Sequence, residues 1–143
     1  MRGDKEAFFD TNVLIYAFAE DDPRTDAAEA LLARGGVVGV QTLNEFVAIA
    51  VRKLAMSWEE VLAALGALRI LCPAPVPITV ETHDPALRIA ARYRYHIYDS
   101  LVIAAALEAS CRTLYSEDMH DGQAIESLTI RNPFRGITLD RID

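Results

Sequence analysis

Four acidic residues, whose carboxylates could bind a divalent cation, stand at points where the hydropathy pattern of the chain changes. Asp10 ends the apolar run EAFF, and Asp118 lies in the polar segment SEDMHDG that follows TLY. Glu45 is the fourth residue of TLNE, and Asp99 begins the segment DSLVIAAALEAS. Each position also has a purely structural interpretation, because Asp caps helices, Thr-x-x-Glu forms a capping box and polar turns are solvated. A chemical role requires that the fold bring the four together.

The elements that would position these acids alternate along the chain. Helices are predicted at 13–19, 24–34, 42–54, 57–69, 84–95 and 99–110. Short apolar strands are predicted at 6–9, 37–40, 113–116 and 127–130, with a weaker one at 76–80. This alternation is typical of an α/β fold, here a three-layer α/β/α sandwich with a mostly parallel central sheet. The 143 residues fit one domain, spanning 1–143.

In such a fold the four acids would meet at one edge of the sheet. Asp10 and Asp118 follow strands, whereas Glu45 and Asp99 stand in the first turns of helices. The carboxyl ends of parallel strands and the N-termini of the following helices lie on the same edge. Converging carboxylates repel and raise one another's pKa values unless a cation lies among them. Mg²⁺ prefers oxygen ligands, so the pattern predicts a hard divalent cation at this edge.

Five segments then identify a family that this chain resembles. They are, in order, FFDTNVLIYAF, QTLNEF, YDSLVIAAA, LYSEDMHDG and TIRNPF. Their order and spacing over about residues 6–136 resemble the PIN-domain family, and in particular the small VapC-type toxin ribonucleases of bacterial toxin–antitoxin pairs. The resemblance implies a PIN-like fold and an endoribonuclease that depends on Mg²⁺, or on Mn²⁺. It also implies a homodimer that a small VapB-like antitoxin protein holds inactive.

The resemblance also implies roles for individual residues. The catalytic and metal-binding acids would be Asp10, Glu45, Asp99 and Asp118. Asn12 would orient the site, and Ser116 matches a small hydroxyl residue of the family. Two further acids in SEDMHDG leave an alternative open, because Asp121 could supplement or replace Asp118, and Glu117 could join the site. In this mechanism a water activated by the metal attacks the phosphorus of RNA and leaves a 5′-phosphate and a 3′-hydroxyl.

The charge of the chain argues against a nucleic-acid substrate unless cations offset it. The net charge is −7, and neither half of the sequence is basic, whereas affinity for phosphate backbones comes largely from Lys and Arg. The best basic segment is RIAARYRYH, residues 88–96, which has three Arg, two Tyr and a His. Arg binds phosphate and stacks on bases, and Tyr also stacks, so the segment is a candidate RNA-binding surface. Its alternative interpretation is the outer face of an ordinary amphipathic helix. Arg52 and Lys53 form a smaller basic pair.

Other features concern compartment and partners. No apolar run reaches the roughly 18 residues of a membrane helix, and the start MRGDKEAFF is unlike a secretory signal, so we expect a cytoplasmic protein without a membrane association. Cys72 and Cys111 lack metal-site spacing and are predicted to be buried, reduced thiols.

The helices at 25–34 and 42–70 contain more Ala and Leu than a small core needs. They either pack in the core or form a groove that binds an antitoxin segment.

Three other classes of protein remain as alternatives. Haloacid-dehalogenase-like phosphatases also begin with a strand that ends in Asp, but they carry a second Asp two places later, where this chain has Asn12. They also need a catalytic Lys, and Lys53 is the last lysine here. A receiver-like signalling module needs paired acids after the first strand and a late Lys, and both are missing. A PIN fold that only binds partners would also fit, although four intact acids disfavour it.

Overall fold

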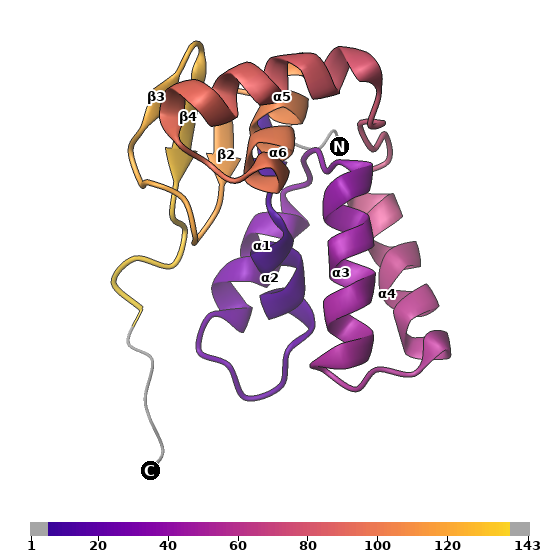
Figure 1. Cartoon of the computed structure of the whole chain (residues 1–143). Coiled ribbons are helices and arrows are strands. Elements are labelled where there is room, and N and C mark those ends of the chain that lie inside the picture. The colour runs from indigo at the N-terminus through magenta and orange to yellow at the C-terminus, as the bar shows by residue number, and fades with distance from the viewer. Residues whose placement is uncertain (1–5, 138–143) are drawn as a thin grey trace.

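The sheet and its helices follow the alternating pattern expected for this sequence (Figure 1). The computed structural model describes residues 6–137. Within that range the helices are α1 (Thr11–Phe18), α2 (Thr25–Ala33), α3 (Val40–Arg52), α4 (Trp58–Leu71), α5 (Val80–Tyr93) and α6 (Ile97–Glu108). The strands are β1 (Ala7–Phe9), β2 (Thr113–Tyr115), β3 (Ala124–Ile125) and β4 (Leu128–Arg131).

The sheet has the strand order β1-β2-β4-β3 and is mostly parallel. β1 pairs with β2, and β2 with β4, in parallel, so that Phe8, Leu114 and Ile130 lie side by side across the sheet. Only the short β3 runs antiparallel, against β4. The parallel strands therefore end at a common edge, where Asp10 and Ser116 follow β1 and β2.

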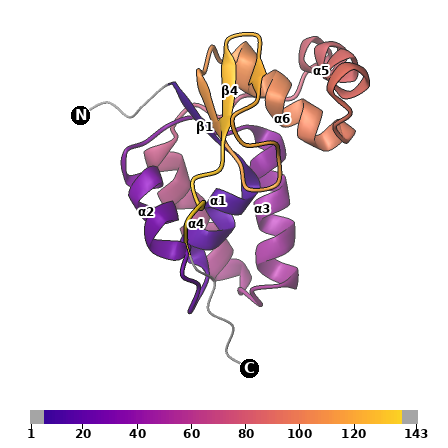
Figure 2. The same cartoon turned by 90° about the vertical axis from the view of Figure 1, so that its left-hand side faces the viewer.

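The alternating side chains of β1 divide the core into two parts, one on each face of the sheet. Phe8 packs with residues of α5 and α6, whereas Ala7 and Phe9 pack with residues of α1 to α4. In Figures 1 and 2, α5 and α6 lie in the upper part of the molecule and α1 to α4 in the lower part. The α/β class and the three layers are thus as predicted from the sequence.

Helix starts are where the sequence-based prediction is wrong most often. The helix predicted from Thr42 begins at Val40, and the helix predicted from Asp84 begins at Val80. The helix predicted from Asp99 begins at Ile97, with His96 at its N-cap. Thr42 is the third residue of α3, and its hydroxyl donates to the carbonyl of Gly39 before the helix. Thr79 directly precedes α5, and its hydroxyl accepts from the N–H of Thr82. Neither helix therefore begins at the residue that the sequence favours as its cap.

Two predicted strands are also absent from the described part of the chain. Residues 37–40 form only isolated parallel bridges, from Val37 to Phe8 and from Gly39 to Val76, and the segment 76–80 leads into α5. β3 was not predicted, because two residues carry no readable alternation. Cys72 and Cys111 are buried thiols, as predicted. No helix among the described residues is long and apolar enough to cross a membrane.

The close approach of residues 35–37 to β1 leads to a first prediction. A Cβ added at Gly36 would lie 2.5 Å from Cε2 of Phe9 and 2.9 Å from the carbonyl oxygen of Ala7. We expect Gly36→Ala to lower the free energy of unfolding by about 1–3 kcal/mol, because the backbone beside β1 must move. Urea denaturation followed by circular dichroism measures the change.

Gly66→Ala is the matched control, because Gly66 is exposed in the middle of α4 and its added Cβ would meet nothing within 4 Å. The control should gain up to about 1 kcal/mol from the higher helix propensity of Ala. A Gly36→Ala variant as stable as the wild type would show that β1 and residues 35–37 are not packed this closely.

Candidate active site

The backbone hydrogen bonds of the sheet fix the position of Asp10 at the end of β1. The N–H group of Asp10 donates to the carbonyl of Tyr115 at 3.0 Å, so the ladder between β1 and β2 continues to this residue. The Asp10 side chain is only 7% exposed. It caps α1 by accepting from the N–H of Thr11 at 2.7 Å, and its second oxygen accepts from the hydroxyl of Ser116 at 2.7 Å. The cap predicted for Asp10 is therefore present, and the same carboxylate also faces the acids described next.

Glu45 is held at the site by side chains of two helices. The Thr11 hydroxyl donates to one carboxylate oxygen at 2.8 Å, and Nε2 of Gln41 donates to the other at 3.1 Å. The capping box predicted for Thr42 and Glu45 does not form. Thr42 instead bonds the backbone of Gly39, both donating and accepting, which leaves the Glu45 carboxylate available for the site.

Asp99 and Asp118 complete the set of acids. Asp99 is in the first turn of α6, and Asp118 lies in the loop after β2, where it accepts from Nδ2 of Asn12 at 2.8 Å. Asn12 and Thr11 are neighbours in the first turn of α1. Their side chains therefore connect Asp118 and Glu45, which are far apart in the sequence, to the helix that follows Asp10.

These four carboxylates line one cavity of about 580 Å³. Its walls come from α1, α3, the start of α6 and the loop after β2, and α3 contributes one helical face with residues at intervals of three and four. The lining residues are Asp10, Thr11, Asn12, Ile15, Tyr16, Glu45, Ala48, Ile49, Arg52, Lys53, Asp99 and Asp118. All four acids predicted from the sequence thus lie in a single cavity.

The acids influence one another electrostatically. Burial raises the pKa of Asp10 to about 6, and the charges of Asp99 and Glu45 add to this, although the hydrogen bonds from Ser116 and Thr11 act in the opposite direction. Burial also raises the pKa of Asp99, as do the charges of Asp118 and Glu45. A cavity that disfavours several negative charges at once favours a cation among them.

The donor set fits a hard cation that keeps part of its water shell. All four side chains offer carboxylate oxygens, which Mg²⁺ and Mn²⁺ prefer. Over residues 6–137, no three His, Cys, Asp or Glu side chains are close enough to form a ready-made cluster of metal ligands. Mg²⁺ commonly binds through one or two carboxylates plus waters and substrate phosphate, so a closed cage of protein ligands is not required.

The other polar residues of the loop after β2 face elsewhere. Asp121 accepts from the N–H of Asn132 at 2.8 Å and from Arg135 at 2.7 Å, and these contacts lower its pKa. Glu117 bonds Tyr16 and Arg24 and does not line the cavity. The exposed His120 lies against Tyr95, with ring centroids 5.7 Å apart. Asp118 is therefore the acid of this loop that faces the cavity.

Sequence reasoning missed the residues that hold the acids in place. Thr11 and Gln41 bond Glu45, and Tyr16 lines the cavity. Gln41 carried a usable signal, since residues four apart on a helix are neighbours. Tyr16 carried a similar one, because it stands four residues after Asn12 on α1. The contact between Thr11 and Glu45 joins residues 34 positions apart and had no local signal.

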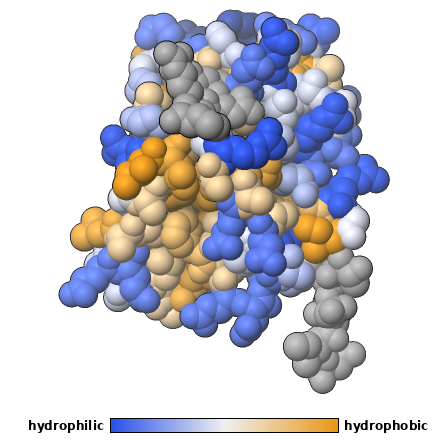
Figure 3. Space-filling model, turned by 180° about the vertical axis from the view of Figure 1, so that it is seen from behind, coloured by the Kyte–Doolittle hydropathy of each residue, from blue (hydrophilic) through white to orange (hydrophobic). Residues whose placement is uncertain are grey.

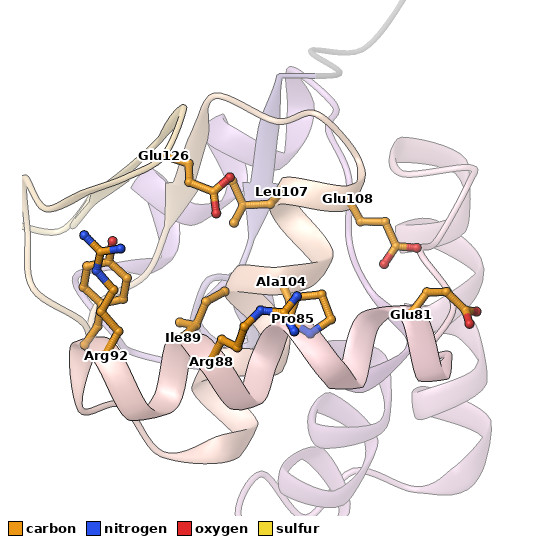
Figure 4. A pocket seen from close by; sticks show the side chains of 10 residues that line it. Glu81, Pro85, Arg88, Ile89, Arg92, Ala104, Leu107, Glu108 and Glu126 are labelled. Carbon is orange, nitrogen blue, oxygen red and sulfur yellow. The ribbon is translucent and has the colours of Figure 1, made fainter.

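The basic residues divide between two cavities. Arg52 and Lys53, at the end of α3, line the cavity of the acids. Arg88 and Arg92, from the basic segment 88–96, instead line a second cavity of about 490 Å³ between α5 and α6. Figure 4 shows that Glu81, Glu108 and Glu126 surround this second cavity as well. The charge of the predicted RNA-binding segment is thus partly offset where Arg88 and Arg92 lie.

Comparisons with known proteins agree with this architecture. The family model described as "PIN domain" matches residues 7–120, which include all four acids of the cavity. This chain belongs to the PIN-domain family. Among solved structures, the PIN-family chain is similar to the crystal structure of VapC20 from Mycobacterium tuberculosis, described as a toxin that cleaves the sarcin–ricin loop. The TM-score is 0.65 at 19% sequence identity, covering 78% of this chain and 89% of that one. No curated protein matches significantly.

The raised pKa of Asp10 predicts how the stability of this PIN domain depends on pH. The folded protein holds the Asp10 proton up to about pH 6, whereas the carboxyl loses it near 3.8 when unfolded. The free energy of unfolding should therefore fall as pH rises from about 4 to about 6, by up to about 3 kcal/mol. Asp10→Asn keeps the cap and should remove much of this loss, stabilising the protein at pH 7 without divalent cations. Thermal denaturation in EDTA at pH 5 and pH 7.5 measures it.

Asp121→Asn is the control of opposite sign, because hydrogen bonds to Asn132 and Arg135 lower the pKa of Asp121. Asp121→Asn should therefore be less stable than the wild type at pH 7, whereas Asp10→Asn should be more stable. An Asp10→Asn variant that melts below the wild type at pH 7.5 in EDTA would contradict the view that the buried charge is unfavourable.

Proposed function

We propose that this PIN-family protein is a cytoplasmic, Mg²⁺-dependent endoribonuclease that acts as the toxin of a VapBC-type toxin–antitoxin pair. The observation that carries the proposal is the convergence of Asp10, Glu45, Asp99 and Asp118 from separate elements into one cavity. Membership of the PIN-domain family and the fold shared with a toxin described as cleaving the sarcin–ricin loop support it further. The proposed reaction is hydrolysis of RNA phosphodiester bonds.

The proposed metal ligands are Asp10, Asp99 and Asp118, with Glu45 positioning the attacking water or a second ion. When bound, Mg²⁺ would lower the pKa of water and offset the negative charge of the scissile phosphate. The chain's own residues prepare the site. Ser116 keeps one Asp10 oxygen in place, Asn12 holds Asp118, and Thr11 and Gln41 fix both oxygens of Glu45.

Arg52 and Lys53 are the side chains best placed to bind the RNA backbone beside the acids. Both are exposed, and both line the cavity that contains the carboxylates. Glu45, Ile49 and Arg52 follow one another at intervals of four and three residues, so they lie on the same face of α3. This placement answers the objection raised by the net charge of −7, because cations lie where a phosphate would approach.

The proposal includes two protein partners, a small antitoxin and a second copy of this chain. The apolar surface over α2 and α4 supports a protein partner (Figure 3). Leu62 and Ile70 of α4 are 65% and 80% exposed. A cavity of about 250 Å³ lies between the end of α1, α2 and α4, and Phe18, Leu32 and Leu71 are among its lining residues. Exposed apolar area of this kind marks partner surfaces. Analytical ultracentrifugation of the pure chain, and titration with a candidate antitoxin, measure the two associations.

The phosphatase alternative gains no support from the site. Asn12 occupies the position where a haloacid-dehalogenase-like enzyme has its acid/base Asp. Its amide donates a hydrogen bond to Asp118, and an amide does not release or take up a proton near neutral pH, so Asn12 does not fit the acid/base role.

RNA cleavage by the purified protein tests the proposed function. Asp99→Asn and Asp118→Asn should each lower the rate by about 100-fold or more, and EDTA should abolish cleavage that added Mg²⁺ restores. Asp121→Asn is the control, because this acid of the same loop is bonded to Asn132 and Arg135 outside the cavity. Cleavage at the wild-type rate by Asp99→Asn, with Mg²⁺ present, would overturn the site assignment.

Two double variants distinguish the basic surfaces. Arg52→Ala/Lys53→Ala should raise KM for RNA about tenfold and reduce the dependence of binding on salt, because two phosphate contacts are lost. Arg88→Ala/Arg92→Ala removes the same charge from the cavity in Figure 4 and should change KM less. Fluorescence anisotropy with labelled RNA at several salt concentrations measures both. A larger increase in KM in Arg88→Ala/Arg92→Ala than in Arg52→Ala/Lys53→Ala would show that residues 88–96 bind the RNA.

A further inference from the structure

Glu117, which directly precedes the proposed metal ligand Asp118, does not line the acid cavity and is bound instead by Tyr16 and Arg24. The Tyr16 hydroxyl donates to its Oε1 atom. Nη1 of Arg24 donates to both carboxylate oxygens, at 3.3 Å and 3.0 Å. The side chains of Arg24 and Glu117 are only 18% and 22% exposed. A partly buried pair of this kind is screened less by solvent than a surface ion pair.

Arg24 is itself fixed by contacts from two directions. Its Nε and Nη2 atoms donate to the two carboxylate oxygens of Asp22, at 2.9 Å and 2.8 Å. Its guanidinium carbon lies 3.7 Å from the centroid of the Tyr16 ring, so the cation stacks on the aromatic face. Bidentate pairing and stacking together use the planar geometry that Arg has and Lys lacks.

The side chains of Glu117 and Asp118 bond α1 in reverse order of sequence. Asn12 bonds Asp118, and Tyr16, four residues later on the same face of α1, bonds Glu117. Two adjacent residues of the loop after β2 are thus attached to α1 at points about one helical turn apart. Asp118 lines the acid cavity and Glu117 does not, although both are carboxylates of the same short segment.

We propose that Arg24 and Tyr16 are positioning residues, which hold Glu117 so that Asp118 faces the acid cavity and Glu117 stays out of it. The inference rests on the proposed metal-dependent function and goes beyond it, because it gives roles to three residues outside the set of acids. Outer contacts that orient metal ligands typically change metal affinity or activity by about 10- to 100-fold when removed. Release of Glu117 would also allow another negative charge to approach the acids and the scissile phosphate.

The test is the affinity for Mn²⁺, measured by isothermal titration calorimetry without RNA, together with kcat and KM for RNA. Arg24→Ala should weaken Mn²⁺ binding about tenfold, because the metal ligand Asp118 is misplaced. It should lower kcat by a larger factor than it changes KM, because the residues that bind RNA remain. Arg24→Lys should recover part of the affinity, because it restores the charge but not the bidentate geometry. Tyr16→Phe keeps the ring and removes the hydroxyl, and about a threefold loss is expected.

Glu117→Gln distinguishes a positioning residue from a metal ligand. Gln keeps an oxygen that accepts from Tyr16 and Arg24, so a loss of about threefold is expected, whereas loss of a ligand should equal the effect of Asp118→Asn. Arg135→Ala is the matched control. It removes an ion pair of 2.7 Å to Asp121 in the same loop and should leave Mn²⁺ affinity unchanged.

The outcomes separate the two proposals. Wild-type affinity and wild-type kcat in Arg24→Ala, or in Tyr16→Phe if the first variant does not fold, would overturn the positioning role and leave the ribonuclease proposal intact. A Glu117→Gln loss as large as that of Asp118→Asn would make Glu117 a ligand and overturn the inference in the same way. A wild-type protein that binds no Mn²⁺ and cleaves no RNA would overturn both.

Discussion

The arrangement of this PIN domain depends on one unfavourable feature, a carboxylate buried at the end of strand β1. Asp10 is 7% exposed and lies beside the charges of Asp99 and Glu45, so that its pKa rises to about 6. The sheet holds it there nevertheless, because its N–H group belongs to the hydrogen-bond ladder between β1 and β2. Free energy from packing and backbone hydrogen bonds thus offsets the part of the cost of this buried carboxylate that its hydrogen bonds to Thr11 and Ser116 leave. Functional sites commonly have such perturbed carboxylates.

The helix that follows Asp10 connects the other acids to it. Thr11 bonds Glu45 of α3, and Asn12 bonds Asp118 of the loop after β2. One turn later Tyr16 bonds Glu117. The first six residues of α1 therefore contact two segments that are distant in the sequence, α3 and the loop after β2. A change in the position of α1 would displace several carboxylates together, so the close packing of residues 35–37 against β1 also matters for the site.

The distribution of basic residues explains how an acidic protein can approach a polyanion. The net charge is −7, but Arg52 and Lys53 lie in the same cavity as the acids. Arg24 neutralises Glu117 close by, which leaves one fewer carboxylate directed at a bound phosphate. Arg88 and Arg92, by contrast, lie among Glu81, Glu108 and Glu126. Local charge, rather than the total, decides where a phosphate backbone is attracted, because screening limits these interactions to about 8–10 Å.

The sequence by itself determined the α/β class, the three layers and the candidate acids, because hydropathy periods and strand-end carboxylates are local signals. It did not determine the true starts of α3, α5 and α6. Those depend on which side chain reaches the backbone, and Thr42 bonds Gly39 and not its expected partner Glu45. Only the tertiary structure decided that Asp118 faces the cavity while Glu117 and Asp121 do not. The three acids lie within five residues and look equivalent in the sequence, and Asn12, Arg24 and Arg135 distinguish them through contacts between distant segments.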